Sequence, residues 1–553
     1  MANYSVLDNA RKQYNPKLPE CLSKDISAVG FEEVNSGAQN PESDKLKEIL
    51  PKTFGGKYVK FVQKTAKSGT KPFSVGIVLS GGQAPGGHNV IAGIFDSLKK
   101  INKDSKLIGF LGGPQGILDD KIMEITKEII DNYRNTGGFD LIGSGRTKIE
   151  TDEQFEKSLQ VCKSRKLDAL VVIGGDDSNT NAALLAEFFA AKNENIAVIG
   201  VPKTIDGDLK TDLIEASFGF DTAAKTFSEL IGNVERDSKS AKKYWHFIKL
   251  MGRSASHIAL ECALQTQPNC TIISEEVKAK NQSLESIIND ITKIVMDRGN
   301  NKENFGVALI PEGLIEFIPE IGALIKEINK LLGDNEQHFS TLKEFEQQSE
   351  WLIKNLSQTA SKVFSSLPKL IREQLLMDRD PHGNVQVSRI ETEKLIVAMV
   401  DTKLKELKES GQYKGKFDSL THFFGYEGRC AFPSNFDADY CYSLGYCATV
   451  LIALGLTGYM TSITGLSKPV SQWVPGGVPI SLLMNLEERK GKMKPVIKKA
   501  LVELDGVPFK TFAKNRDEWA KNTSFIYPGA IQYFGPDEVC NQPTITLTLE
   551  KGK

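Results

Sequence analysis

The sequence has no excess of charge of either sign and no cysteine spacing typical of a metal site. Its 69 Lys and Arg residues balance 70 Asp and Glu residues, which leaves a net charge of −1. This balance gives no reason to expect nucleic acid or an acidic membrane surface as a partner. The eight cysteines are scattered, without a CxxC pair. We therefore expect reduced thiols and a cytoplasmic location.

The sequence also has no segment with the clear signature of an export signal or a membrane span. No apolar core of signal-peptide length follows Met1. Residues 440–467 contain no charged side chain and are long enough to cross a bilayer. Serine, threonine and glycine residues dilute the hydrophobicity of this segment. We therefore expect a buried helix and strand there, and no contact with a membrane.

The order of apolar and helical stretches predicts an α/β fold with more than one domain. The 553 residues are enough for roughly two to four domains. Strands are expected at 73–79, 107–111, 170–173, 196–201, 245–250, 270–273 and 305–310, and helices at 90–99, 122–133 and 179–190. Strands that alternate with helices are typical of a doubly wound sheet.

Changes in composition and pattern along the chain suggest where the domains begin and end. We expect an N-terminal extension at 1–70, an α/β domain at 71–219 completed by about 430–485, a second α/β domain at 220–318 and 417–429, a helical insertion at 319–416, and a C-terminal segment at 486–553. The insertion is rich in Leu, Lys and Glu at helical spacing and holds no cluster of catalytic residue types. This favours a surface elaboration or a partner interface.

Acidic side chains follow two of the expected strands, at 170–173 and 196–201. The charged residues of these two loops are Asp176, Asp177, Lys203, Asp206 and Asp208. Because the carboxyl ends of parallel strands meet at one edge of a sheet, we expect both loops to face one crevice, where doubly wound folds bind ligands. The arrangement suits phosphate chemistry with a divalent metal. The alternative is that these acids cap helices and turns, as Asp often does.

Two of these carboxylates have natural chemical roles. Asp176 is a candidate Mg²⁺ ligand, because Mg²⁺ prefers one or two carboxylates together with phosphate oxygens and water. Asp206 is a candidate base, because a carboxylate beside Thr204 on a strand-end loop could take a proton from a sugar hydroxyl. Asp208 or the metal would polarise the same hydroxyl group.

A glycine-rich loop, residues 80–89, follows the first expected strand and precedes a helix. Glycines let backbone N–H groups wrap an anion, and the helix N-terminus adds a favourable partial charge. The loop matches neither GxGxxG nor the P-loop pattern, and a tight turn is the alternative. Strand-end or glycine-flanked side chains that could contact phosphate or sugar hydroxyls are Arg146, Arg253, Arg429 and Glu312.

Six motifs, in this order, resemble the phosphofructokinase family. They are Ser80-Gly81-Gly82-x-Ala84-Pro85-Gly86, Gly174-Gly175-Asp176-x-Ser178, Pro202-x-Thr204-Ile205-Asp206-x-Asp208, Met251-Gly252-Arg253, Pro311-Glu312-Gly313 and Gly425-Tyr426-Glu427-Gly428-Arg429. The resemblance covers roughly residues 73–480. It implies two doubly wound, Rossmann-like domains and Mg²⁺-dependent phosphoryl transfer to the 1-hydroxyl of fructose 6-phosphate in glycolysis.

The resemblance also implies roles for individual residues. Gly82 and Arg146 would contact the phosphoryl donor, Asp176 would hold Mg²⁺, and Asp206 would accept the proton of the sugar 1-hydroxyl. Fructose 6-phosphate would be held by Thr204, Ile205, Asp206, Met251, Gly252, Arg253, Glu312, Tyr426, Glu427, Gly428 and Arg429. A homodimer is implied as well, in which Lys243 and Tyr244 reach the sugar-phosphate site of the neighbouring subunit. An ordinary strand edge is the alternative for these two residues.

Two positions indicate the phosphoryl donor. ATP-using members of the family have glycine where this chain has Asp177 and Lys203, whereas pyrophosphate-using members have this Asp and Lys. A carboxylate at Asp177 would repel a nucleotide α-phosphate by about 4 kcal/mol for unit charges about 4 Å apart at an effective dielectric constant of about 20. Lys203 could neutralise charge on the transferring phosphoryl group.

The sequence therefore resembles the long, pyrophosphate-using branch of the family, with Asp177 and Lys203 added to the catalytic residues. The alternatives are an ATP-dependent 6-phosphofructokinase and a non-catalytic regulatory subunit that binds sugar phosphate. The presence of Asp176, Thr204 and Asp206 argues against the regulatory subunit, because such a chain needs neither a metal ligand nor a base.

Overall fold

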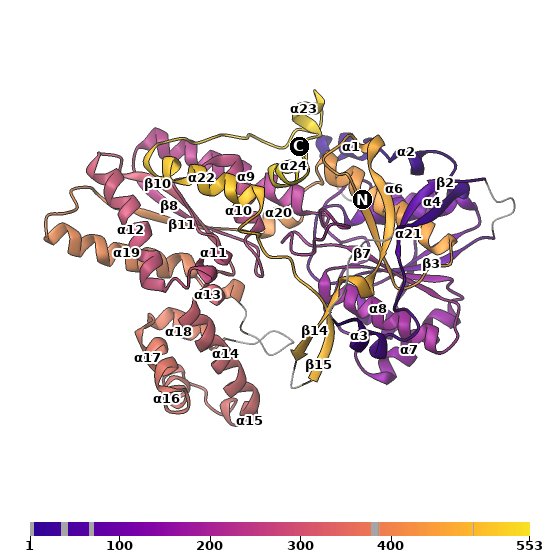
Figure 1. The fold of residues 1–553 in the computed structure, drawn as a ribbon, viewed down its shortest axis with the longest axis horizontal. Coiled ribbons are helices and arrows are strands. Elements are labelled where there is room, and N and C mark those ends of the chain that lie inside the picture. Colours follow the sequence, from indigo (N-terminus) through magenta and orange to yellow (C-terminus); the bar gives the residue numbers. More distant parts are fainter. Residues whose placement is uncertain are drawn as a thin grey trace. The chain divides into compact units, whose positions relative to one another are not determined.

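The computed structural model describes residues 5–34, 42–65, 71–377, 385, 387–489 and 492–552. The chain divides into two compact units. The first unit comprises Met1–Thr226, Tyr426–Ala500 and Ile531–Lys553, and the second comprises Phe227–Gly425 and Leu501–Ala530. Each unit is built on its own sheet, and the helices that cover each sheet are visible in Figure 1.

The first unit contains a nine-stranded sheet of order β1-β2-β13-β12-β7-β6-β3-β4-β5. Its parallel strands are β12 (Tyr459–Thr464), β7 (Ala197–Pro202), β6 (Ala169–Gly174), β3 (Ser74–Leu79) and β4 (Lys106–Phe110). Antiparallel strands at its two sides are β1 (Val29–Val34), β2 (Tyr58–Gln63), β13 (Val474–Pro479) and β5 (Ile122–Glu124). The central strands β3, β6 and β7 are almost continuous apolar runs, as expected of parallel strands covered by helices on both faces.

The helices of the first unit complete the doubly wound arrangement. They are α1 (Val6–Lys12), α2 (Glu20–Ser23), α3 (Ser43–Ile49), α4 (Gly87–Ile101), α5 (Pro114–Leu118), α6 (Lys127–Asp131), α7 (Asp152–Ser164), α8 (Asp176–Ala191), α20 (Tyr426–Arg429), α21 (Asn435–Ala453), α23 (Asp537–Cys540) and α24 (Ile545–Lys551). Figure 1 shows α4 and α21 on one side of the sheet and α7 and α8 on the other. A hairpin of β14 (Met484–Arg489) and β15 (Lys492–Ile497) forms a separate two-stranded sheet.

The uncharged segment at 440–467 is a buried helix and strand, as the sequence predicts. It forms most of α21, followed by β12. Helices α21 and α4 approach each other at Gly445 and Gly93, where an added Cβ would overlap backbone atoms of the facing helix. None of the described helices combines the length and the hydropathy needed to span a membrane.

The prediction of one helix over residues 122–133 is wrong. The first part of this segment is the short strand β5, which pairs with β4, and α6 begins only after Thr126. The side chain of Thr126 caps α6 by accepting the N–H of Ile129 at 3.4 Å. Pairing with the edge of the sheet therefore overrode an apolar pattern that is compatible with a helix.

The second unit contains a four-stranded parallel sheet of order β11-β8-β10-β9. The strands are β8 (Tyr244–Leu250), β9 (Cys270–Thr271), β10 (Phe305–Pro311) and β11 (Ser419–Phe424). Helices α10 (His257–Thr266), α11 (Ser274–Ala279), α12 (Leu284–Asn300), α13 (Leu314–Phe317) and α22 (Val507–Lys521) accompany them. Helix α9 (Phe220–Ala241) begins in the first unit, and most of its residues belong to the second.

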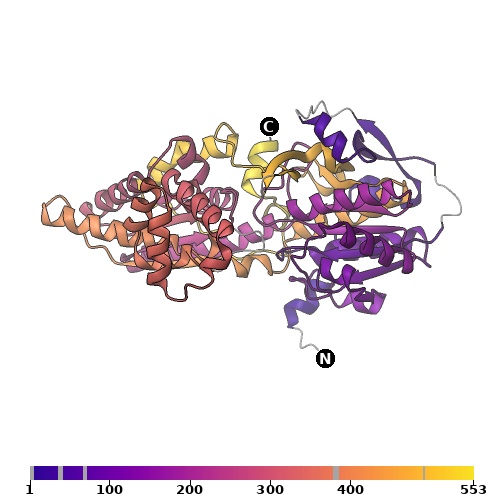
Figure 2. The ribbon, with the colours of Figure 1, turned by 90° about the horizontal axis from the view of Figure 1, so that it is seen from below.

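Residues 319–416 of the second unit are largely helical, as the sequence predicts, and Figure 2 shows these helices gathered together. They are α14 (Pro319–Asp334), α15 (Glu336–Phe339), α16 (Phe345–Asn355), α17 (Gln358–Ser366), α18 (Lys369–Leu375) and α19 (Thr392–Glu409). Their apolar side chains share one core with the sheet, in which Ile396 and Val400 of α19 belong to the same cluster as Trp245 and Phe247 of β8. The insertion is thus packed as part of this unit.

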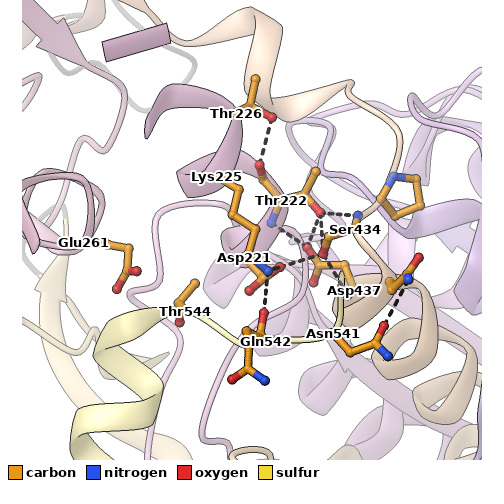
Figure 3. Close-up of polar contacts among 12 residues, drawn as sticks. Asp221, Thr222, Lys225, Thr226, Glu261, Ser434, Asp437, Asn541, Gln542 and Thr544 are labelled. Atoms are coloured by element: carbon orange, nitrogen blue, oxygen red, sulfur yellow. Dashed lines mark hydrogen bonds and ion pairs between the residues drawn. The ribbon is translucent and has the colours of Figure 1, made fainter. Parts of the chain in front are cut away.

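Within the first unit, a buried polar cluster ties the C-terminal residues to the start of α9 (Figure 3). The carboxylate of Asp437 in α21 accepts the N–H of Thr222 at 2.9 Å and its hydroxyl at 2.5 Å. Lys225 forms an ion pair with Asp221 at 2.7 Å and also donates to the carbonyl oxygen of Gln542 at 2.6 Å. Burial, and then the neighbouring Asp221, raise the pKa of Asp437 to about 7.

Candidate active site

The structure brings the two acidic loops together at the carboxyl ends of β6 and β7. These strands are adjacent and parallel, with Gly174 opposite Pro202, and the N–H of Lys203 donates to the carbonyl oxygen of Gly174 at 3.0 Å. Helix α8 begins at Asp176, three residues earlier than the sequence predicts. Asp176 and Asp177 therefore lie in its first turn, where the helix dipole favours negative charge.

Lys203 lies against the glycine-rich loop. Its side chain is almost fully buried, and its Nζ donates to the carbonyl oxygen of Gly82 at 2.7 Å. Gly81 has a φ of +86°, a conformation that glycine adopts without strain, and a Cβ at this position would lie 3.3 Å from Nζ. Burial lowers the pKa of Lys203 to about 8, although the nearby Asp206 acts to raise it.

Two arginines from distant parts of the first unit also lie close to Gly82. A Cβ at Gly82 would lie 3.8 Å from Nη2 of Arg146 and 3.9 Å from Nη1 of Arg429. The guanidinium of Arg429 lies over the ring of Tyr426 at 4.6 Å, and its buried Nε has no hydrogen-bond partner among the described residues. Together with Lys203, these groups form a positive cluster around a glycine turn, which suits a phosphate ligand.

Two lysines at this site were not singled out from the sequence. Nζ of Lys148 lies 3.2 Å from a carboxylate oxygen of Asp177, and Nζ of Lys499 lies 3.6 Å from Asp176 and 3.7 Å from Asp208. Lys148 is two residues from Arg146, and this proximity was the available signal. The sequence around Lys499 carries no such signal, because its contacts join segments far apart in the chain.

The acidic side chains fit a Mg²⁺ ion that arrives with a phosphate ligand. Among the residues that the structure describes, no group of three or more His, Cys, Asp or Glu side chains is arranged to hold a metal. Mg²⁺ needs fewer, because it usually takes one or two carboxylates and completes its shell with phosphate oxygens and water. Asp176 and Asp208 approach the same lysine nitrogen, at 3.6 and 3.7 Å. Both carboxylates therefore lie within ion-pair range of the Lys499 ammonium, which places two negative charges in this part of the site.

A second set of predicted residues meets at the carboxyl edge of the sheet in the second unit. Glu312 is 3% exposed, and its carboxylate accepts the N–H of Gly252 at 2.9 Å. The φ of +134° at Gly252 favours glycine. Gly313 packs so closely that an added Cβ would overlap the carbonyl oxygen of Arg253. The motifs after β8 and β10 are thus held together, and the side chain of Arg253 remains exposed.

Lys243 and Tyr244 are not brought to these residues. They lie at the start of β8, whereas Met251 follows its last residue. Seven residues of strand span about 20 Å. In one subunit, the two ends of β8 are therefore too far apart to contact the same ligand group. Nζ of Lys243 lies over the ring of Tyr244 at 5.1 Å. Within one subunit, Lys243 and Tyr244 thus lie at the opposite end of β8 from the Met251–Arg253 turn.

The remaining predicted residues belong to the first unit. The N–H of Asp206 donates to the hydroxyl of Thr204 at 3.1 Å, and Ser217 donates to the carbonyl oxygen of Thr204 at 3.1 Å. Ile205 is buried and anchors the loop, and its neighbours Thr204 and Asp206 are half-buried. Tyr426, Glu427, Gly428 and Arg429 form the single turn α20.

A sheet with a parallel centre, and with acidic loops, a glycine turn and a basic cluster at its carboxyl edge, defines an α/β protein suited to binding phosphate groups. The particular family follows from comparison with known sequences. The family model described as Phosphofructokinase matches residues 74–359, and the chain belongs to the phosphofructokinase family. The resemblance seen in the six sequence motifs is confirmed.

Full-length relatives and solved structures agree with this assignment. Proteins named pyrophosphate–fructose 6-phosphate 1-phosphotransferase, from Porphyromonas gingivalis and Entamoeba histolytica, are each 54% identical to this chain over 547 residues, which cover 99% of both chains. The structure of a pyrophosphate-dependent phosphofructokinase from Nitrosospira multiformis matches with a TM-score of 0.54 and 16% identity, over 85% of this chain and 95% of that chain. This structural match confirms the predicted α/β fold.

Proposed function

We propose that this chain is a reversible enzyme that transfers a phosphoryl group from inorganic pyrophosphate to the 1-hydroxyl of fructose 6-phosphate. The products would be fructose 1,6-bisphosphate and phosphate, as a step of glycolysis in the cytoplasm. The observation that carries this proposal is the buried Lys203 at the glycine turn, next to the acidic loops. Relatives that are 54% identical over almost the whole chain carry the name of this activity.

The donor end of the reaction would use residues of the first unit. Gly82 and Arg146 would contact pyrophosphate, and the ammonium of Lys203 would stabilise charge on the transferring group and the leaving phosphate. Asp177 would exclude a nucleotide, because its carboxylate would repel an α-phosphate. The ion pair with Lys148, at 3.2 Å, holds that carboxylate in place.

Asp176, with Asp208 beside it, would hold Mg²⁺ here. When bound, this ion supplies charge neutralisation at the phosphoryl oxygens. Asp206 would accept the proton of the sugar 1-hydroxyl, on a loop whose shape is set by the hydrogen bond between its N–H and Thr204.

In the second unit, the residues that would contact the acceptor are Met251, Gly252, Arg253 and Glu312. The carboxylate of Glu312 accepts the N–H of Gly252, and the N–H of Glu312 donates to the carbonyl oxygen of Leu250. These two hydrogen bonds fix this part of the site before substrate binds. Such preorganisation lowers the cost of binding.

The test of this proposal is product formation by the purified chain with Mg²⁺ and fructose 6-phosphate, with pyrophosphate or ATP supplied separately. We expect fructose 1,6-bisphosphate from pyrophosphate only, and formation of pyrophosphate from fructose 1,6-bisphosphate and phosphate. Product from ATP alone would favour an ATP-dependent 6-phosphofructokinase. Product from neither donor would favour a regulatory subunit that binds sugar phosphate.

We propose further that the active form is a homodimer in which Lys243 and Tyr244 complete the site of the partner. In an isologous dimer, mixing the inactive variants Lys243→Met and Asp206→Ser should restore activity, because a hybrid dimer contains one intact site. At random pairing the mixture should regain about a quarter of the wild-type activity. No recovery after confirmed subunit exchange would mean that each site is built within one subunit.

A further inference from the structure

The helical insertion contacts the sheet of the second unit through a buried lysine. Lys249, the sixth residue of β8, is 3% exposed. Its Nζ lies 3.4 Å from the carboxylate of Glu393, in the first turn of α19, and donates to the carbonyl oxygen of Ile390 at 2.9 Å. Glu393 is 5% exposed. Because a buried ammonium is costly without partners, this contact holds the start of α19 against β8.

The insertion side of this contact is itself held by a second helix. Gln374, in α18, donates to the carboxylate of Glu391 at 2.9 Å and accepts the N–H of Glu391 at 2.8 Å. Glu391 directly follows Ile390, whose carbonyl oxygen accepts from Lys249. Helices α18 and α19 therefore present a carbonyl oxygen and a carboxylate to the lysine as one assembly.

The sheet side of the contact leads directly to the predicted sugar-phosphate residues. Lys249 precedes Met251 by two positions, and Met251 directly follows the last residue of β8. The N–H of Met251 donates to the carbonyl oxygen of Phe424 in β11 at 3.0 Å. The ring of Phe423 lies 4.6 Å from Nζ of Lys249. The lysine thus sits where β8, β11 and the insertion meet, immediately before the Met251–Arg253 turn.

We propose that the insertion positions the sugar-phosphate residues of this unit through the buried Lys249–Glu393 pair. This inference rests on the function proposed for Met251, Gly252, Arg253 and Glu312, and it replaces the expectation that the insertion is a surface elaboration. Lys249 and Glu393 are positioning residues, because their side chains act through the end of β8 and not on a reacting atom. Loss of the pair should weaken the binding of fructose 6-phosphate and leave pyrophosphate binding, by residues of the first unit, unchanged.

The first experiment compares the kinetics of Glu393→Gln and Lys249→Met with those of wild type. We expect the KM for fructose 6-phosphate to rise by about tenfold or more, because small displacements of binding residues have large effects, whereas the KM for pyrophosphate should stay within about twofold. Lys249→Arg keeps the charge and the donors and should retain most of the affinity. The matched controls are Lys369→Met and Glu346→Gln, which remove a largely exposed ion pair of the same insertion with an N–O distance of 2.9 Å.

A second readout does not depend on the reaction. Hydrogen exchange at the amides of Met251 and Gly252, measured without substrate, should be faster in Glu393→Gln than in wild type and in the Glu346→Gln control. If wild type forms no product with any donor, the proposed function fails, and this exchange measurement alone decides the positioning role. If Lys249→Met does not fold, Glu393→Gln and Lys249→Arg provide the comparison.

Two results would overturn the proposal. The first is a folded Glu393→Gln variant with unchanged exchange at these amides and an unchanged KM for fructose 6-phosphate. The second is an equal loss of affinity for both substrates with unchanged local exchange, which would make the pair a contributor to stability only.

Discussion

The carboxyl edges of the two sheets differ in what they hold. In the first unit, Lys203, Asp176 and Asp177 gather charges of both signs at one place, and burial shifts the pKa of Lys203 to about 8. In the second unit the corresponding edge is shaped by a buried carboxylate, that of Glu312, which accepts the backbone N–H of Gly252. The first edge is suited to stabilising the charges of a phosphoryl transfer, and the second to holding a ligand in a defined place.

The largest expected effect follows the replacement of Asp206, the proposed proton acceptor at the first edge. Asp206→Ser should lower kcat by about 10²- to 10⁴-fold, because the sugar hydroxyl loses its proton acceptor. The affinity for fructose 6-phosphate, measured by equilibrium binding, should change little. A comparable loss of sugar binding would instead make Asp206 a substrate-holding residue and would remove the contrast between the two edges.

The next effect concerns the lysine of the first edge. Lys203→Met should lower kcat with pyrophosphate by about 10²- to 10³-fold, because a fixed positive charge at the transferring group is lost. In wild type, kcat/KM for pyrophosphate should fall as the pH rises through about 8, where the Lys203 ammonium loses its proton.

Lys203→Arg should move this basic limb to higher pH, because the guanidinium stays protonated. The control is Lys71→Met, which removes an exposed lysine paired with Asp168 at 2.8 Å. If the basic limb keeps its position in Lys203→Met, another group is responsible for it.

The donor preference should change by a smaller amount. Asp177→Gly removes the carboxylate that would repel an α-phosphate, and we expect the ratio of ATP to pyrophosphate turnover to rise by about tenfold or more. Parallel assays with the two donors measure this ratio, and Asp119→Asn, at an exposed carboxylate 3.4 Å from Lys121, is the control. Undetectable ATP use in Asp177→Gly would mean that exclusion of the nucleotide has a further cause.

The second edge should respond mainly in affinity. Glu312→Ala leaves the buried N–H of Gly252 without its acceptor, at a cost of about 1 to 3 kcal/mol. We expect the KM for fructose 6-phosphate to rise by about tenfold while the KM for pyrophosphate is unchanged. Equal changes for both substrates would show that this edge is not specific for the sugar.

The remaining effect is on stability and not on activity. Burial raises the pKa of Asp439 to about 7, although its carboxylate accepts the N–H of Lys17 at 2.7 Å and the hydroxyl of Tyr14 at 2.9 Å. Between about pH 4 and pH 7 the folded state therefore binds more protons than the unfolded state. The free energy of unfolding should fall as the pH rises, by up to about 1.4 kcal/mol per pH unit.

Asp439→Asn is a clean test of this dependence, because both donors bind the same oxygen, Oδ1, which asparagine retains. Denaturant unfolding at pH 5 and pH 7 should show a smaller difference in the variant than in wild type. An unchanged pH dependence would mean that Asp439 does not titrate in this range.

Much of the fold could be predicted, because the buried strands of the first unit are continuous apolar runs bounded by glycine and charged residues. The strands β3, β4, β6 and β7 lie within a residue or two of their predicted positions. The helix at 122–133 was wrong, since a short strand in an edge position depends on its neighbour β4 and not on its own pattern. Nor did local pattern show that β1 and β2 extend the large sheet.

The contacts of the candidate site likewise divide into those that could be predicted from the sequence and those that could not. The meeting of Asp176 with Lys203 could be predicted, because consecutive parallel strands end at one edge. The contacts of Lys499 with Asp176, and of Lys249 with Glu393, could not, since each joins segments far apart in the sequence. No local spacing encodes such a pair.

The sequence by itself determined the family, the doubly wound fold class and the kinds of side chain at the strand ends, because ordered motifs and apolar periodicity are local properties. The tertiary structure decided the electrostatic state of those side chains. Lys203 has a lowered pKa only because folding removes it from water. The partners Lys148, Lys499 and Glu393 are likewise set by the packing of distant segments, which brings charges together that the linear order keeps apart.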